Sequence, residues 1–280
     1  MLGARRTTVY HVTGRLRERE NDLTYCLAIR VDQGLVFASD SRTNAGADHV
    51  STFSKMHVFE YADDQGAKRA ICLLSAGNLA TTQAVLRSIR RDNESGKGLR
   101  LDSARDLAEA AEYVGRLSRN EQRKHVSEKD KKFSPEASFI LGGQIAGRQH
   151  QLYMIYPEGN YISATVQTPY LQVGELKYGK PILDRIVRED LSLEVAARCA
   201  LVSMDSTMRS NATVGPPVEL MIYPAGALKF GKRLVLQEDN EYLRALRLAW
   251  QQGLEEAFER LPGLPISRPP VQLVETLTDQ

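Results

Sequence analysis

Thr24 stands at the head of an apolar stretch, "TYCLAIRV", and could do chemistry from that position. If a folded domain begins at Thr24 with a free amino group, one residue carries both a hydroxyl nucleophile and an amine base. An α-amine has an ordinary pKa of about 7.7–8.0, so much of it is neutral at cytoplasmic pH and can accept the hydroxyl proton. Thr24 is therefore predicted to be the nucleophile of a hydrolase.

Asp40 and Lys55 carry the charges that such a nucleophile needs. A tight Asp-Gln-Gly turn at 32–34 makes the stretch after Thr24 one arm of a β-hairpin. Pairing around this turn returns Asp40 to Thr24. Lys55 begins a later apolar run, and its ammonium group would lower the pKa of the amine by like-charge repulsion. A buried lysine requires a carboxylate partner, and Asp40 is predicted to be that partner.

Gly77 completes the predicted machinery. It lies in "LLSAGN", at a predicted strand-to-helix junction, where its backbone N–H could stabilise an oxyanion. Thr43, Ser75 and Leu79 lie close to Thr24 by position and are predicted to line the substrate pocket. Their side chains favour a small or apolar substrate residue.

The apolar pattern predicts runs of strands that alternate with pairs of helices. Strands are predicted at 24–31, 34–41, 55–61, 68–76, 137–147, 150–159, 160–166, 217–224 and 233–237. Helices are predicted at 78–92, at 102–120 with Ser103 as its cap, at 177–190, at 192–210 and at about 240–260. The segments 44–54 and 121–134 are predicted to be a turn and a charged surface loop. This order favours an α+β fold, a four-layer αββα sandwich of two antiparallel sheets flanked by helix pairs, although another mixed connectivity also fits the periodicity.

Composition excludes several classes of function. The 280 residues have a net charge of only +2, and the basic residues are scattered, so no nucleic acid partner is expected. No apolar run approaches the roughly 18 residues of a membrane span, and no membrane association is expected. The three cysteines indicate reduced, buried thiols in a cytoplasmic protein. The five histidines have no ligand spacing, so neither a metal nor a cofactor is expected.

Gly142 and Gly143 lie inside a strand and indicate close backbone approach, not a phosphate loop.

Several motifs resemble a known family. "TYCLAIRVDQGLVFASDSRT", "SKM" and "LLSAGNLATTQA" resemble the proteasome β-subunit branch of the N-terminal-nucleophile hydrolases. "GLVFASDSRTNAG", "VGELKYGKPILDR" and "SMDSTMRSNATVG" resemble Anbu, the bacterial proteasome-like peptidase family, and the likeness runs from Thr24 to about Leu236. The resemblance implies an αββα fold, a ring-like or open helical homo-oligomer, and metal-free hydrolysis of peptide or protein substrates. It implies the same roles for Thr24, Asp40, Lys55 and Gly77.

Some positions differ from the proteasomal pattern that the resemblance implies. Asn78 stands where a second glycine is usual, and Glu175 replaces a serine-rich stretch that assists the amine. Ser210, Asn211 and Thr213 are all candidates for the polar residues that support the nucleophile.

Residues 1–23 are arginine-rich, poor in apolar residues and unlike a folded core, so they are predicted to be a weakly ordered extension. The expected organisation is this extension, a hydrolase domain at 24–236, and a C-terminal helix with a Pro-rich tail at 237–280. Thr24 has a free amine only if residues 1–23 are a self-cleaved propeptide, or if translation starts at position 23, where a TTG or CTG start codon reads as leucine. Besides the threonine peptidase, a silent self-assembling scaffold and an amidase for small amides fit the sequence.

Overall fold

The computed structural model describes residues 24–44, 50–62, 66–125 and 134–264. Residues 1–23 and the Pro-rich tail beyond 264, on which the sequence makes predictions, lie outside the described residues, as do 45–49 and 126–133. In the part of the chain that the structure describes, no helix is both long and apolar enough to span a membrane.

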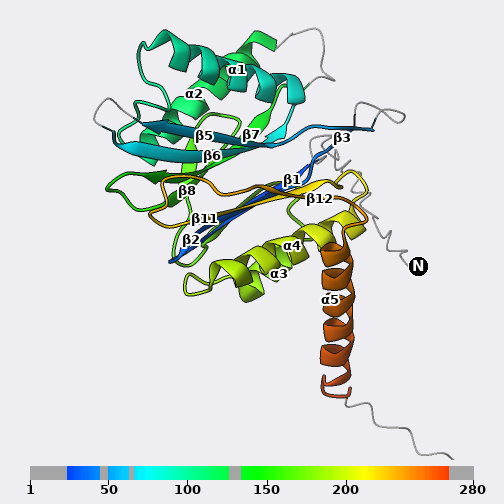
Figure 1. The fold of residues 1–280 in the computed structure, drawn as a ribbon. Helices are drawn as coiled ribbons and strands as arrows, with labels where there is room; N and C mark the ends of the chain where they lie inside the picture. Colours follow the sequence, from blue (N-terminus) through cyan, green and yellow to red (C-terminus); the bar gives the residue numbers. More distant parts are fainter. Residues whose placement is uncertain (1–23, 45–49, 63–65, 126–133, 265–280) are drawn as a thin grey trace, which may run out of the picture.

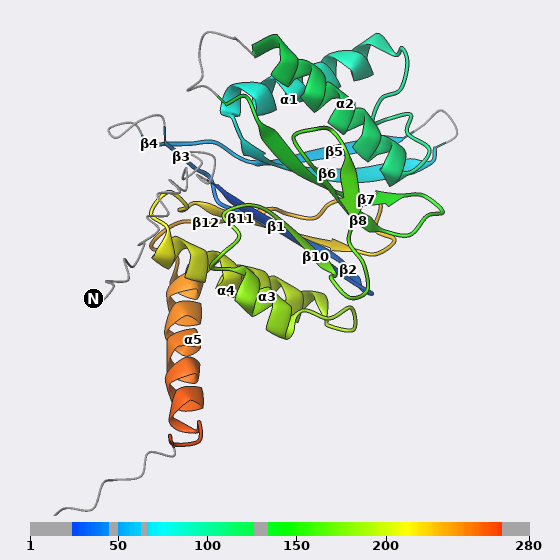
Figure 2. The ribbon, with the colours of Figure 1, turned by 180° about the vertical axis from the view of Figure 1, so that it is seen from behind.

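Two five-stranded antiparallel sheets lie face to face, each covered by a pair of helices (Figures 1 and 2). The first sheet has the order β10 (Tyr170–Gly174), β1 (Tyr25–Val31), β2 (Gly34–Ser39), β11 (Val218–Pro224) and β12 (Leu234–Leu236). The second has the order β5 (Met56–Ala62), β6 (Lys68–Gly77), β7 (Ala137–Ile145), β8 (Gln151–Ile155) and β9 (Tyr161–Ser163). A separate ribbon pairs β3 (Arg42–Asn44) with β4 (Val50–Thr52).

The helices are α1 (Leu79–Ser95), α2 (Leu107–His125), α3 (Lys180–Ile186), α4 (Leu193–Ser210) and α5 (Glu241–Glu259). Helices α1 and α2 cover the second sheet, while α3 and α4 cover the first (Figures 1 and 2). The predicted four-layer αββα sandwich is therefore confirmed. Helix α5 covers neither sheet; it begins at the α4 layer and projects away from the body (Figure 1).

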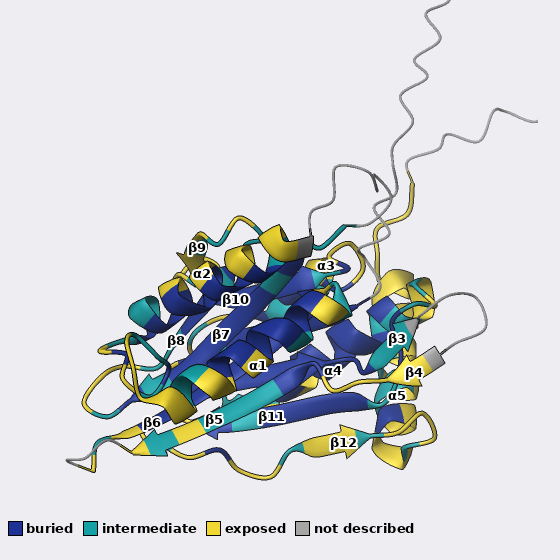
Figure 3. Ribbon diagram, turned by 90° about the horizontal axis from the view of Figure 1, so that it is seen from above, coloured by how far each residue is buried: buried dark blue, intermediate teal, exposed yellow. Residues whose placement is uncertain are grey.

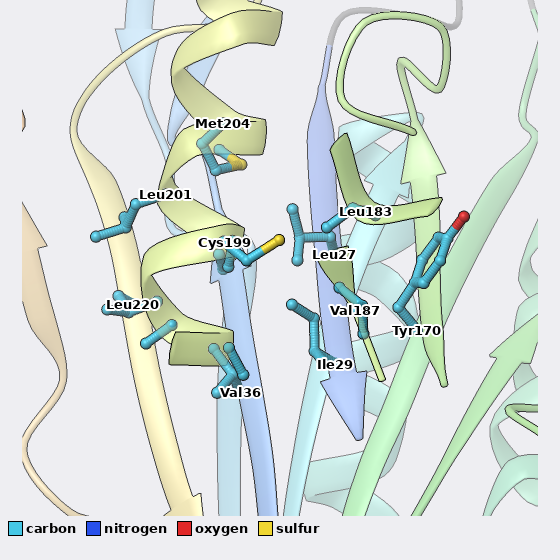
Figure 4. Packing of buried hydrophobic residues seen from close by; sticks show 14 of the residues in the cluster. Leu27, Ile29, Val36, Tyr170, Leu183, Val187, Cys199, Leu201, Met204 and Leu220 are labelled. Atoms are coloured by element: carbon cyan, nitrogen blue, oxygen red, sulfur yellow. The ribbon is translucent and has the colours of Figure 1, made fainter. Parts of the chain in front are cut away.

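Three apolar layers hold the sandwich together. The inner layer between the sheets is built from residues such as Cys26, Phe37 and Ile140. The two outer layers join each sheet to its helices, and Figure 4 shows one of them, where Leu27 and Ile29 of β1 meet Cys199 of α4. The buried positions form a continuous interior when the molecule is seen from above (Figure 3). Burial of apolar surface on both faces of each sheet is the main stabilising term of this fold.

The paired glycines of β7 show why their positions accept no side chain. A Cβ on Gly142 would lie 2.3 Å from Leu152 Cδ2, and a Cβ on Gly143 would lie 2.0 Å from the Ala70 carbonyl oxygen. The close approach predicted for this pair is confirmed. A Cβ on Gly142 would also lie 2.8 Å from Phe37 Cε1 of the other sheet, so this glycine lets the two sheets pack tightly through β7.

Several predicted boundaries were wrong for identifiable reasons. Helix α2 begins at Leu107, because the Asp106 side chain accepts the Glu109 N–H at 2.9 Å, while Ser103 instead caps a turn at Arg100. It also continues to His125, into the segment predicted to be a loop. The segment 44–54, predicted to be a turn, contains β4 and the last residue of β3, and β10 was not predicted at all.

Candidate active site

The β1–β2 hairpin places Asp40 next to the first described residue, Thr24. Cys26 pairs with Ser39, so the register continues to Tyr25 and Asp40. The Asp40 N–H donates to the Tyr25 carbonyl oxygen at 3.1 Å, and the Tyr25 N–H donates to Asp40 Oδ1 at 3.0 Å. Thr24 is 6% exposed and Asp40 is fully buried. The proximity of these residues follows from the length of the hairpin.

Lys55 and Asp40 form a buried ion pair. Lys55 Nζ lies 2.6 Å from Asp40 Oδ1 and donates a second hydrogen bond to the Arg42 carbonyl oxygen at 2.6 Å. Asp40 Oδ2 accepts the Gly215 N–H at 3.3 Å. Burial raises the pKa of the Asp40 carboxyl, and the Lys55 charge and the hydrogen bonds from Lys55, Tyr25 and Gly215 oppose that rise. The pair fixes the Lys55 ammonium group in place.

Thr24 and Lys55 line one cavity of about 590 Å³. Gly77, Thr43, Ser75 and Leu79 line the same cavity, so the structure brings together every predicted site residue, with Asp40 behind Lys55. Only glycine fits at position 77, because its φ is +98° and a Cβ would lie 2.4 Å from the Glu136 carbonyl oxygen. Asn78 follows as the N-cap of α1 and accepts the Thr81 N–H at 3.1 Å. Asn78 also lines the cavity, so the positive end of the helix dipole lies beside it.

Comparison with known proteins identifies the family of this chain. The family model "Proteasome subunit" matches residues 24–223. Anbu (ancestral β-subunit) from Yersinia bercovieri is 43% identical over 87% of this chain and all of its own, with a TM-score of 0.79. The chain belongs to the Anbu family of proteasome subunits. The helical assembly of the Anbu complex from Pseudomonas aeruginosa has 43% identity over 86% of this chain and 98% of its own, with a TM-score of 0.80. Anbu from Hyphomicrobium sp. strain MC1 has 41% identity over 87% of this chain and all of its own, with a TM-score of 0.77. Comparison with curated protein sequences gives no match.

A second polar cluster of this Anbu-family chain lies against Thr24. The Glu175 N–H donates to the Thr24 carbonyl oxygen at 2.8 Å, and Glu175 itself is 3% exposed. The carboxylate accepts the Asn211 side-chain amide at 3.0 Å and the Lys177 N–H at 2.9 Å. Asn211 in turn accepts the Thr213 hydroxyl at 2.6 Å. Of the candidates that the sequence left open, Asn211 and Thr213 join this cluster, whereas Ser210 is exposed at the end of α4.

Four further residues that line the cavity of this Anbu-family chain, from β5 and α1, were not predicted from the sequence. His57 of β5 lines it, and burial together with the charges of Arg233 and Arg90 lowers the pKa of His57 to about 4. Gln83, Arg87 and Arg90 of α1 also line it. Their i, i+4 and i, i+3 spacing from Leu79 was the available signal, because such residues share a helix face. Among the described residues, no three His, Cys, Asp or Glu side chains gather as a metal site would require.

Proposed function

We propose that this chain is a threonine peptidase of the proteasome type, with Thr24 as nucleophile and its own α-amine as base. The observation that carries the proposal is the 2.6 Å Lys55–Asp40 ion pair, whose lysine lines the same cavity as Thr24. A buried ammonium group beside an α-amine keeps the amine neutral near pH 7, which a general base requires. The family model matches from residue 24, the position at which this chemistry needs the chain to begin.

The proposed reaction has two halves. Thr24 Oγ attacks the carbonyl carbon of the substrate while the α-amine takes the hydroxyl proton, and the Gly77 N–H stabilises the oxyanion. Collapse of the tetrahedral intermediate breaks the C–N bond, and the leaving amine receives the proton. Water, activated by the same amine, then hydrolyses the ester on Thr24. Because the base is the α-amine, residues 1–23 must be absent from the active molecule, by self-cleavage or by a start at position 23.

We also propose that the subunit acts as a cytoplasmic homo-oligomer, ring-like or open and helical. The Pseudomonas aeruginosa relative is described as a helical assembly. Helix α5 extends beyond the body with exposed Leu254 and Phe258, and exposed Leu261 follows its end, a surface suited to a second copy. The three described cysteines are buried and unpaired, which suits a reducing compartment.

Covalent labelling tests the nucleophile. A peptide carrying an electrophile for threonine hydroxyls should modify Thr24, with the modified peptide identified by mass spectrometry. Thr24→Ala should abolish labelling and Thr24→Ser should retain it. N-terminal sequencing of the labelled protein should begin at Thr24. A label on another residue, or an active chain still joined upstream of Thr24, would refute the mechanism.

A further inference from the structure

The outer side of the substrate cavity carries uncompensated positive charge. Arg87 and Arg90 line the cavity that contains Thr24, and neither forms an ion pair or hydrogen bond with any described residue. By contrast, Arg91 on the same helix contacts Asp92 and Ser88 and does not line the cavity. Two guanidinium groups therefore face this space without an internal partner in the described chain.

No carboxylate among the described lining residues neutralises this charge. The lining contains no Asp or Glu, and its third cation, Lys55, is already paired with Asp40. The Glu219 carboxylate lies next to Ser54, a lining residue, and accepts its hydroxyl at 2.8 Å. This carboxylate is already paired with Arg233 at 3.3 Å. The cavity therefore attracts an anionic group from the substrate.

The arginines can reach a substrate held at Thr24. Leu79, Gln83 and Arg87 follow one face of α1, and the rise of 1.5 Å per residue separates Leu79 from Arg87 by about 12 Å. Side chains on a helix lean toward its N-terminus, which here is the end beside Gly77. A long arginine side chain on this face is therefore expected to lean along the cavity toward Thr24.

The pKa of His57 is affected by the positive charges around the cavity. Its imidazole lines the cavity, and burial with the charges of Arg233 and Arg90 lowers the pKa of His57 and so favours its neutral form. The influence of Arg90 therefore extends from α1 to β5. A neutral His57 can hydrogen-bond a substrate carboxylate through a ring N–H without adding a charge of its own.

We propose that this cavity takes a carboxylate-bearing substrate residue, so that the subunit cleaves after acidic residues, glutamate above all. Glutamate is favoured over aspartate because its longer side chain extends farther toward Arg87. The inference rests on the proposed peptidase function and adds the substrate class to it. It differs from the small or apolar preference expected from Thr43, Ser75 and Leu79, because Arg87 and Arg90 line the same cavity.

Matched peptide substrates test the inference. Peptides that differ only in the residue before the cleaved bond (Glu, Gln, Leu or Arg) are compared by kcat/KM with the mature oligomer. Glu should exceed Gln by about tenfold, the lower end of what a charge-assisted hydrogen bond supplies. Arg87→Gln with Arg90→Gln should remove that ratio, whereas Arg91→Gln should keep it. Higher ionic strength should reduce the ratio, because the arginines are exposed.

The outcomes separate this inference from the proposed function. Turnover of the Gln or Leu peptide at least as fast as the Glu peptide overturns the acidic preference and leaves the peptidase intact. If no peptide turns over, the affinities of the Glu and Gln peptides are measured by titration of the Thr24→Ala protein, and their difference tests the acidic preference. Tighter binding of the Glu peptide, lost in the double arginine variant, supports the inference; equal binding overturns it. Failure to label Thr24 refutes the peptidase separately.

Discussion

Glu175 binds the main chain of the proposed nucleophile: its N–H donates to the Thr24 carbonyl oxygen at 2.8 Å. The carboxylate of the same residue is held by Asn211 and by the Lys177 N–H. Thr24 is thus flanked by two charged systems, the Lys55–Asp40 pair and the Glu175 cluster. In the proposed mechanism, the first would disfavour a proton on the α-amine and the second would favour one, so their balance would set the pH at which the amine acts as base.

Glu175→Gln should shift the pH dependence of activity. Removing a carboxylate near the α-amine lowers the pKa of that amine, so the rising limb of kcat/KM should move by about half a unit to lower pH. Glu194→Gln, on the exposed N-terminal turn of α4, makes the same change in net charge and should leave the limb in place. If Glu175 has only a structural role, Glu175→Gln should lower kcat/KM at every pH and leave the midpoint of the rising limb unchanged.

The Lys55–Asp40 pair should show strong energetic coupling. Lys55→Met leaves the fully buried Asp40 without its cation and should lower the free energy of unfolding by about 3 kcal/mol. Urea unfolding of Lys55→Met, Asp40→Asn and the double variant measures the coupling, and the double variant should lose less than the sum. The exposed pair Lys180–Asp184 is the control, and Lys180→Met should cost under about 0.5 kcal/mol. Additive losses at Lys55 and Asp40 would contradict the buried pair.

The return of Asp40 to the Thr24 end of β1, where it pairs with Tyr25, could be predicted because an antiparallel hairpin has a fixed register once its turn is identified. Asp40 could be predicted as the partner of Lys55, because a charge that is buried without a partner is costly. The link from Glu175 to Asn211 could not be predicted, because 36 residues separate them and no local period connects distant segments. Strand β10 was missed for a similar reason. Its five residues are too few for a periodic signal, and only pairing with β1 defines them.

Gly77→Ala should impair both stability and catalysis. The φ of +98° disfavours any Cβ, and the Glu136 carbonyl oxygen would lie 2.4 Å from it, so the backbone must shift. The free energy of unfolding should fall by about 2–3 kcal/mol, and kcat should fall by about 100-fold if the oxyanion donor moves. Gly96→Ala has a similar positive φ with open space around its Cβ, and it should cost only about 1 kcal/mol and no activity. Unchanged kcat in Gly77→Ala would remove Gly77 from the oxyanion site.

His57 should make the folded state sensitive to mild acid. Its pKa is about 4 in the folded chain and about 6.5 when unfolded, so below pH 6.5 the unfolded state binds more protons. The stabilisation from neutral His57 is complete above pH 6.5 and is lost as the pH falls toward 4, by at most about 3 kcal/mol. His57→Gln should therefore lose less stability than the wild type between pH 7 and pH 5 in urea unfolding. Parallel losses in the two proteins would show that His57 is not the group responsible.

The apolar stripe of α5 should hold the oligomer together. Leu243 is 3% exposed against the body, and the same helix face continues through Leu254 (51%) and Phe258 (76%), where the described chain offers no cover. Leu254→Glu with Phe258→Glu places charges where a second copy would bury them, so the mass in light scattering should fall toward that of one subunit. Ala245→Glu with Gln252→Glu, on the opposite and exposed face, adds the same two negative charges and should leave the mass unchanged. An intact oligomer in the double variant, with unchanged helix content by circular dichroism, would place the subunit contact elsewhere.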